Sequence, residues 1–148
     1  MEKFRVLLVD DEEDFVSTLS ERLEMRDLDS QMAFDGEQAL EVMQDGVPDV
    51  MVLDLKMPGI DGMEVLRRMK KLYPKVQVVI LTGHGSDKDE EQARRLGAFE
   101  YLQKPVNLED LVEVLKRAYQ KKVETSLMAA TVAEAGEPES ALKLMKDK

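Results

Sequence analysis

The sequence contains no cysteine and only one histidine, His84. Disulfides, thiol nucleophiles and thiolate or multi-histidine metal sites are therefore excluded. Its apolar runs, such as residues 76–81, are far shorter than the roughly 20 residues that a transmembrane helix needs. The N-terminal Met-Glu-Lys-Phe-Arg also lacks the apolar region and cleavage site of a signal peptide. We expect a cytoplasmic protein without a membrane partner, whose chemistry rests on oxygen ligands.

Basic residues are outnumbered, since 21 Lys and Arg stand against 31 Asp and Glu, for a formal net charge of −10. Sequence-independent affinity for nucleic acids comes from Lys and Arg that displace counterions, so we expect no direct nucleic-acid partner. Most of the acidic residues simply favour solubility. A chain of 148 residues is long enough for one domain with a hydrophobic core, plus a tail.

Short apolar runs alternate with helical patterns along the chain. The run at residues 4–9 stops at an acidic stretch, after which Phe15, Val16, Leu19 and Leu23 recur at helical spacing. The alternation returns at 30–34 with 36–44, 50–53 with 62–72, 76–81 with 87–96, and 99–102 with 108–121. Five such units predict an α/β fold with a doubly wound parallel sheet. The second strand and the fourth helix are the least apolar elements.

The pattern changes beyond Lys122. Apolar and small residues suited to two short helical pieces follow, namely Leu127, Thr131 and Ala135, then Ala141, Leu142 and Met145, with a break at Gly136-Glu137-Pro138. We therefore expect a domain over residues 1–122 and a partly helical tail over 123–148. Neither piece can bury its apolar face alone, so the tail packs on its own domain, stays unstructured, or docks on a partner or a second copy.

Three carboxylates follow predicted strands. Asp10 and Asp11 end the first strand, and Asp54 ends the third. In an open parallel sheet the functional crevice lies at the carboxyl ends of the strands, so these side chains meet if the two strands are neighbours. Singly, each is best explained as a helix cap or loop residue. Together they repel one another unless a cation compensates them, and Mg²⁺ suits such ligands.

The fourth and fifth predicted strands also end in polar residues, Thr82 and Lys104. A hydroxyl and an ammonium that converge on a carboxylate–metal site are what phosphoryl transfer to an aspartate requires. In such a site Asp54 is the candidate nucleophile.

These motifs carry a family resemblance. Their order and spacing are Val-Asp-Asp at 9–11, Asp54 with Met-Pro-Gly at 57–59 and Asp-Gly at 61–62, Leu-Thr-Gly at 81–83, and Lys-Pro at 104–105. Over residues 3–122 the chain resembles the receiver domain of two-component response regulators. The resemblance implies a CheY-like, flavodoxin-like fold of strand order 2-1-3-4-5 with five helices, here followed by a C-terminal helical extension.

Receivers of NtrC-type transcription activators are particularly similar at Leu-Thr-Gly-His-Gly, residues 81–85. The phosphate-binding loop of the ATPase domain in such activators is absent from this chain. The signal must then pass to another protein, or the chain is an excised piece of a longer one.

The resemblance also implies roles for the site residues. Asp54 accepts a phosphoryl group from a sensor histidine kinase or a phosphotransfer protein. Asp11, Asp54 and the backbone carbonyl of Lys56 bind Mg²⁺ directly, Asp10 binds it through a water, and Lys104 binds a phosphoryl oxygen. Such a protein is not an enzyme in the usual sense, because it catalyses only its own phosphorylation and dephosphorylation.

A two-state switch is a further implication of the resemblance. Thr82 moves toward the phosphoryl group and Tyr101 turns inward behind it. The movement changes the face formed by the fourth helix, fifth strand and fifth helix, here called the output face. A downstream effector or a second copy binds this face. A cis peptide bond is implied between Lys104 and Pro105.

Three loop residues are candidates for tuning the lifetime of the phosphoryl group. Lys56 and His84 lie two positions beyond Asp54 and Thr82, and a histidine titrates near neutral pH. Gly83 leaves room for the phosphoryl group to approach. All three are equally consistent with ordinary loop residues.

Two other interpretations compete with phosphoryl acceptance. Haloacid-dehalogenase-type phosphatases also use an aspartate nucleophile beside Mg²⁺, but they carry Asp-x-Asp after the first strand, whereas Asp54 is followed by Leu55 and Lys56. A receiver-like interaction module that is never phosphorylated usually lacks an acidic residue, the Thr or the Lys. All of these are present here, so this module remains only as the alternative, acting through its output face or its tail.

Overall fold

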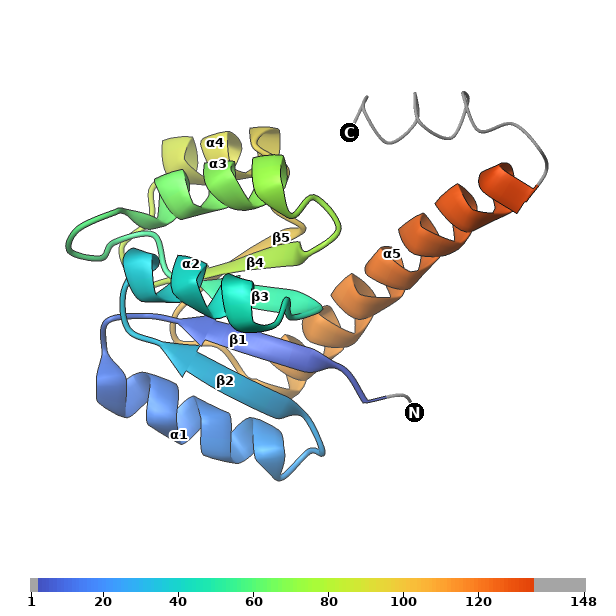
Figure 1. Ribbon diagram of the computed structural model, residues 1–148. Helices are drawn as coiled ribbons and strands as arrows, with labels where there is room; N and C mark the ends of the chain where they lie inside the picture. The colour runs from blue at the N-terminus through green and yellow to red at the C-terminus, as the bar shows by residue number, and fades with distance from the viewer. Residues whose placement is uncertain (1–2, 135–148) are drawn as a thin grey trace.

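The computed structural model describes residues 3–134 as a parallel sheet between two layers of helices (Figure 1). Its strands are β1 (Arg5–Val9), β2 (Asp29–Ala33), β3 (Val50–Leu53), β4 (Gln77–Thr82) and β5 (Glu100–Gln103). Its helices are α1 (Glu13–Glu24), α2 (Gly36–Asp45), α3 (Gly62–Leu72), α4 (Asp87–Arg95) and α5 (Leu108–Glu134). The strand order β2-β1-β3-β4-β5 confirms the predicted doubly wound fold.

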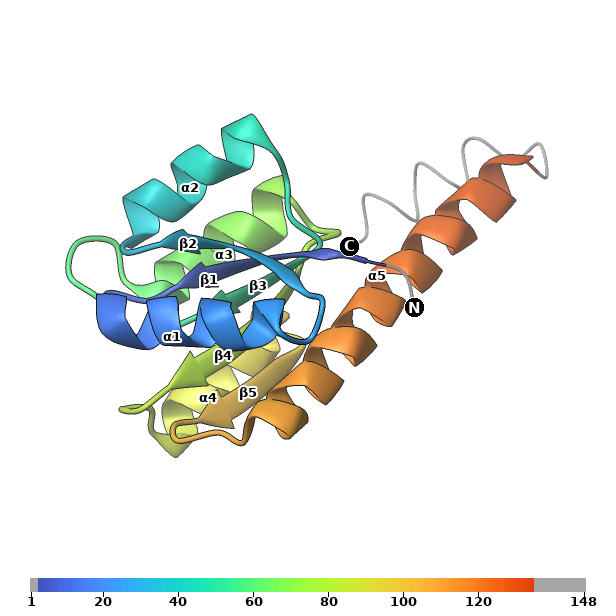
Figure 2. The ribbon, with the colours of Figure 1, turned by 90° about the horizontal axis from the view of Figure 1, so that it is seen from below.

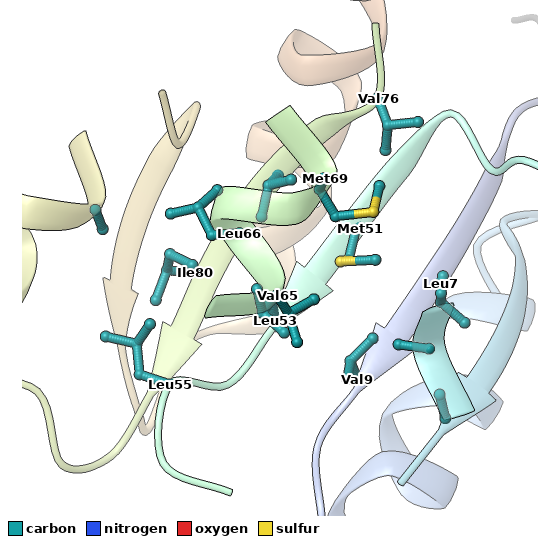
Figure 3. Packing of buried hydrophobic residues seen from close by; sticks show 14 of the residues in the cluster. Leu7, Val9, Met51, Leu53, Leu55, Val65, Leu66, Met69, Val76 and Ile80 are labelled. Atoms are coloured by element: carbon teal, nitrogen blue, oxygen red, sulfur yellow. The ribbon is translucent and has the colours of Figure 1, made fainter. Parts of the chain in front are cut away.

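Alternate residues of the central strands pack into opposite halves of the core. On one side they join a cluster with α2, α3 and α4, to which Met51 and Ile80 belong (Figure 3). On the other side they join a cluster with α1 and α5, to which Val52 and Leu81 belong. Both faces of the sheet are thus covered, which explains why these strands read as nearly continuous apolar runs.

The register of the strands sets the level of the polar residues that follow them. Val9 of β1 pairs with Leu53 of β3, and the Asp54 N–H donates to the Val9 carbonyl at 3.0 Å. At the far edge, the N–H of Lys104 donates to the Thr82 carbonyl at 2.9 Å. The polar ends of β1, β3, β4 and β5 therefore meet along one edge of the sheet.

The two least apolar elements of the sequence are also the most exposed ones. β2 is an edge strand with one fully buried residue, and Ala93 is the buried residue of α4. α4 begins with a capping box, in which the Asp89 N–H donates to the Ser86 hydroxyl and the Ser86 N–H to the Asp89 carboxylate. Such a cap satisfies backbone groups at the start of a helix that gains little from burial.

Helix α5 is longer than predicted. The expected end at Lys121 is wrong, because the helix continues without a break to Glu134 and projects beyond the sheet (Figure 2). No glycine or proline interrupts residues 108–134, so nothing in the local sequence stops the helix. Lys122, which forms an ion pair with Asp49, lies within this continuous helix. The predicted break at residues 136–138 and the second helical piece lie outside the described residues.

Across residues 3–134, no helix is both long and apolar enough to cross a membrane.

Candidate functional site

Three carboxylates meet at the carboxyl edge of the sheet, as the sequence predicts. The ligand oxygens of Asp10, Asp11 and Asp54 all lie within 4.8 Å of one another. Asp10 and Asp54 are buried, while Asp11 is exposed. Oδ1 of Asp54 is buried and lacks a hydrogen-bond partner among the described residues. A buried carboxylate oxygen without a partner is costly, and a divalent cation would supply the missing interaction.

The donor set fits Mg²⁺. The oxygens of Asp10, Asp11 and Asp54 lie within 4.8 Å of one another, so small side-chain shifts would bring them around one ion, directly or through a bound water. The exposure of Asp11 leaves one side of the cluster open to water, and Mg²⁺ in proteins usually keeps several waters.

Burial and charge both disfavour ionisation of Asp54. Its burial raises the pKa of Asp54, and the neighbouring charge of Asp10 raises it further. The Thr82 hydroxyl, Lys104 and the backbone N–H of Lys56 act in the opposite direction without overcoming this rise. An added cation would act against this rise, because a nearby positive charge favours the ionised form of the Asp54 carboxylate.

Lys104 reaches the same edge from β5. Its Nζ donates to Oδ2 of Asp10 at 2.6 Å and to Oε1 of Glu12 at 3.1 Å, and it lies 4.2 Å from the centre of the Phe15 ring. Burial lowers the pKa of Lys104, but the hydrogen bonds and charges of these carboxylates outweigh burial and leave it raised. The peptide bond from Lys104 to Pro105 is cis.

The contacts of Glu12 and Phe15 with Lys104 were not predicted from the sequence. Glu12 belongs to the acidic stretch that follows the first apolar run, and Phe15 to the apolar positions of the helix after it. The available signal was their position just after Asp11: Glu12 is the N-cap of α1 and Phe15 lies in its first turn, which begins at the polar edge of the sheet.

Gly62 has a packing role that its motif did not reveal. A Cβ atom at this residue would lie 2.1 Å from the Asp54 carbonyl oxygen and 2.6 Å from Cα of Leu55. The Gly62 N–H also donates to the Leu55 carbonyl at 3.0 Å. The start of α3 therefore packs directly on the backbone of the acceptor loop, at a distance that only glycine permits.

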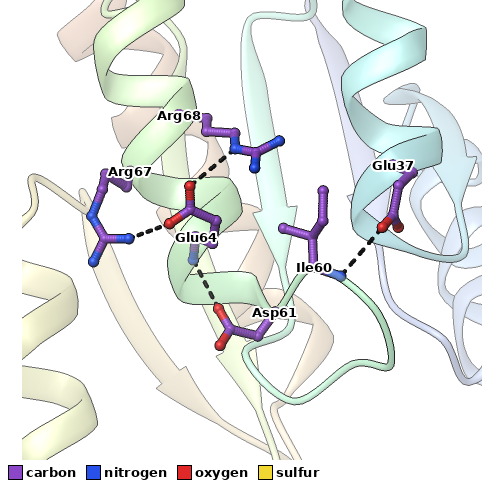
Figure 4. Close-up of polar contacts among 6 residues, drawn as sticks. All are labelled: Glu37, Ile60, Asp61, Glu64, Arg67 and Arg68. Atoms are coloured by element: carbon purple, nitrogen blue, oxygen red, sulfur yellow. Dashed lines mark hydrogen bonds and ion pairs between the residues drawn. The ribbon is translucent and has the colours of Figure 1, made fainter.

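Side chains around this loop hold the start of α3 in place (Figure 4). Asp61 caps the helix by accepting from the Glu64 N–H at 2.9 Å. Glu64 in turn pairs with Arg67 and Arg68, while Glu37 of α2 accepts from the Ile60 N–H at 3.4 Å. The loop from Asp54 to α3 is thus anchored at its far end.

The two predicted switch residues lie behind the carboxylates. Thr82 is fully buried, and its hydroxyl accepts from the His84 N–H at 3.4 Å. Tyr101 points inward, with 7% of its surface exposed and no hydrogen-bond partner for its hydroxyl among the described residues. A Cβ atom at Gly85 would lie 1.6 Å from that hydroxyl, so this glycine makes room for the inward ring.

The three predicted tuning residues lie at the rim of the site. Lys56 pairs with Asp89 of α4 at 3.7 Å, so its ammonium is directed toward α4. His84 is exposed. A Cβ atom at Gly83 would make only ordinary contact with Lys104, 3.8 Å from its Cδ, so the entrance tolerates a methyl group there.

One consequence for stability follows from the raised pKa of Asp54. A carboxyl whose pKa is raised by folding binds more protons in the native than in the unfolded state, so stability falls as pH rises through its titration, upward from about 4. Without Mg²⁺ at neutral pH, Asp54→Asn is expected to raise Tm by a few degrees. Thermal unfolding followed by circular dichroism measures the change.

The exposed Asp11 provides the matched control, since Asp11→Asn should change Tm less than Asp54→Asn. Mg²⁺ should raise the Tm of the wild type and have little effect on Asp54→Asn. A variant Asp54→Asn that is less stable than the wild type without Mg²⁺ would contradict this account.

Fold and site together define a doubly wound α/β domain with an acidic site at the ends of its central strands. Residues 6–116 match the family model of the response regulator receiver domain. The chain therefore belongs to the response regulator receiver domain family of two-component signalling.

Two curated relatives illustrate the extent of the similarity. A putative NtrX-like response regulator of Rickettsia felis is 35% identical over 120 residues, which cover 80% of this chain and 25% of that protein. The transcriptional regulatory protein CpxR of Escherichia coli is 37% identical over 119 residues, which cover 78% of this chain and 50% of that protein. The chain thus matches a quarter to a half of the length of these relatives.

Solved structures agree with the fold. The receiver domain of NtrX from Brucella abortus has a TM-score of 0.74 at 32% identity, covering 78% of this chain and 98% of that one. A CheY-like receiver domain protein from Methanospirillum hungatei has a TM-score of 0.80 at 26% identity, covering 84% and 99%.

Proposed function

We propose that Asp54 accepts a phosphoryl group from a sensor histidine kinase or a phosphotransfer protein, with Mg²⁺ held by the neighbouring carboxylates. The observation that carries this proposal is the buried, unpartnered Oδ1 of Asp54 in a cluster with Asp10 and Asp11. Such an oxygen is a ligand without a cation, and its carboxylate is the nucleophile that phosphoryl transfer to an aspartate needs.

Each residue of the site has a part in the transfer. Asp11, Asp54 and the Lys56 backbone carbonyl would bind the ion directly, and Asp10 would act on it through a water. When bound, Mg²⁺ neutralises charge on the phosphoryl oxygens. A carboxylate oxygen of Asp54 attacks phosphorus as the phosphorus–nitrogen bond of the donor histidine breaks. Lys104 donates to a phosphoryl oxygen beside its present partner Asp10.

The same residues connect the modification to a surface. Thr82 moves toward the phosphoryl group, and Tyr101 turns inward behind it, into the position that its ring has in this structure. The face of α4, β5 and α5 then presents one of two shapes to a downstream effector or a second copy. Lys56, Gly83 and His84 tune the lifetime of the modification.

With this function the chain is a cytoplasmic signalling protein rather than an enzyme that turns over a substrate. The chain catalyses only its own phosphorylation and dephosphorylation. Residues 1–122 form the receiver, and residues 123–148 extend it. The long α5 leads directly from the output face into that extension.

The test is the intact mass of the protein after treatment with acetyl phosphate, with and without Mg²⁺. The wild type is expected to gain one phosphoryl group only when Mg²⁺ is present, and Asp54→Ala is expected to gain none. Asp14→Ala, which removes an exposed carboxylate in the first turn of α1, is the matched control and should behave like the wild type. Modification of Asp54→Ala, or none of the wild type, would contradict the proposal.

An unphosphorylated interaction module is the second candidate. The observation in its favour is that Tyr101 points inward beside Gly85, the position that the switch assigns to the phosphorylated form. Absence of any mass gain on the folded wild type would favour this candidate.

A further inference from the structure

The ammonium of Lys104 is held on one side by an aromatic ring. Its Nζ lies 4.2 Å from the centre of the Phe15 ring, while Asp10 and Glu12 accept its hydrogen bonds. Apolar packing explains why residue 15 is apolar, since Phe15 packs against the core between the sheet, α1 and α5. It does not explain why the face of a ring lies against a cation, where the ring quadrupole attracts positive charge.

We propose that Phe15 is a positioning residue, whose ring face directs the Lys104 ammonium at the acceptor site. A lysine side chain has a flexible four-carbon stem and three donor hydrogens. Hydrogen bonds to carboxylates alone therefore leave the direction of its ammonium loosely defined. One of its two carboxylate partners, Glu12, is 61% exposed and constrains Lys104 weakly. The ring is uncharged, so it holds Lys104 without competing with a phosphoryl oxygen for its protons.

The surroundings of Phe15 allow this idea to be tested by substitution. A groove of about 410 Å³ between α1 and the start of α5 opens beside the ring, and it is lined by Leu19, Val106 and Leu111 among others. The added hydroxyl of Phe15→Tyr has room there and keeps the ring face. Phe15→Leu keeps the apolar bulk and removes the ring.

Chemical shifts of the Lys104 ε-methylene protons report whether the face of the Phe15 ring lies against the end of the lysine side chain. The Phe15 ring current is expected to shift them upfield in the wild type and in Phe15→Tyr. In Phe15→Leu the upfield shift should disappear. A shift that survives in folded Phe15→Leu, or vanishes in folded Phe15→Tyr, overturns the proposal.

The rate of phosphorylation by acetyl phosphate with Mg²⁺ is the second measurement, and this arm rests on the proposed function. Phe15→Leu should be phosphorylated about three- to fivefold more slowly than the wild type, and Phe15→Tyr within about twofold of it. Leu19→Ala, which trims the same groove, should also stay within about twofold. Equal rates for Phe15→Leu and the wild type overturn the positioning role. If the wild type gains no phosphoryl group, the proposed function fails, and the chemical shifts still decide whether the ring lies against Lys104.

Discussion

Gly62→Ala is expected to lower the free energy of unfolding by more than about 3 kcal/mol, the upper end of the usual cost of overpacking. The added methyl carbon would lie 2.1 Å from the Asp54 carbonyl oxygen, and backbone atoms cannot swing aside as the end of a flexible side chain can. Helix propensity alone predicts the opposite sign, because alanine is favoured over glycine by up to about 1 kcal/mol within a helix. The sign of the change therefore separates close packing from propensity.

Urea unfolding of the wild type and Gly62→Ala measures this loss. Gly83→Ala is the matched control, because its methyl group would meet only the Lys104 side chain, at ordinary contact distances. We expect its stability to change by no more than about 0.5 kcal/mol. Should Gly62→Ala unfold at the same denaturant concentration as the wild type, the close approach of α3 to the acceptor loop is wrong.

Lys104→Met is expected to lower the free energy of unfolding by about 3 kcal/mol in the absence of Mg²⁺. Methionine replaces most of the lysine stem but leaves the buried carboxylate of Asp10 without its cation, beside the buried carboxylate of Asp54. Breaking a buried pair from one side is costly, because the remaining charge is neither solvated nor paired. Mg²⁺ should restore part of the lost stability, since it compensates the same carboxylates.

Denaturant unfolding at neutral pH, with chelator and with saturating Mg²⁺, measures both parts of this prediction. Glu12→Gln is the informative comparison, because it removes the exposed partner of Lys104 and keeps the buried one. Its loss of stability should be much smaller. Equal losses for the two variants, or a loss for Lys104→Met that Mg²⁺ leaves unchanged, would contradict a buried Lys104–Asp10 pair that shares its site with the metal.

These two variants act on different parts of one site. Gly62 determines how closely α3 packs on the backbone that carries Asp54, whereas Lys104 balances the charge of the carboxylates beside it. Mg²⁺ should therefore help Lys104→Met and leave most of the loss in Gly62→Ala, because an ion cannot relieve a steric overlap of backbone atoms.

The fold was predictable because its signals are local. Strands covered on both faces read as apolar runs, and each run is followed by a helical pattern. The two least apolar elements are also present. β2 is an edge strand, and α4 is stabilised by its capping box. The end of α5 was missed because a change in apolar pattern at Lys122 was taken for a helix end, although nothing in the local sequence stops a helix there.

The sequence by itself determined which groups stand at the ends of the strands: Asp10, Asp11, Asp54, Thr82 and Lys104 lie within two residues of strands that local pattern defines. Only the tertiary structure decided what surrounds them. The ring of Phe15 against Lys104, the close packing of Gly62 and the space that Gly85 leaves for Tyr101 all join residues from different elements. Such contacts depend on how the helices and loops pack against the sheet. The local sequence pattern does not give the distances between residues of different elements.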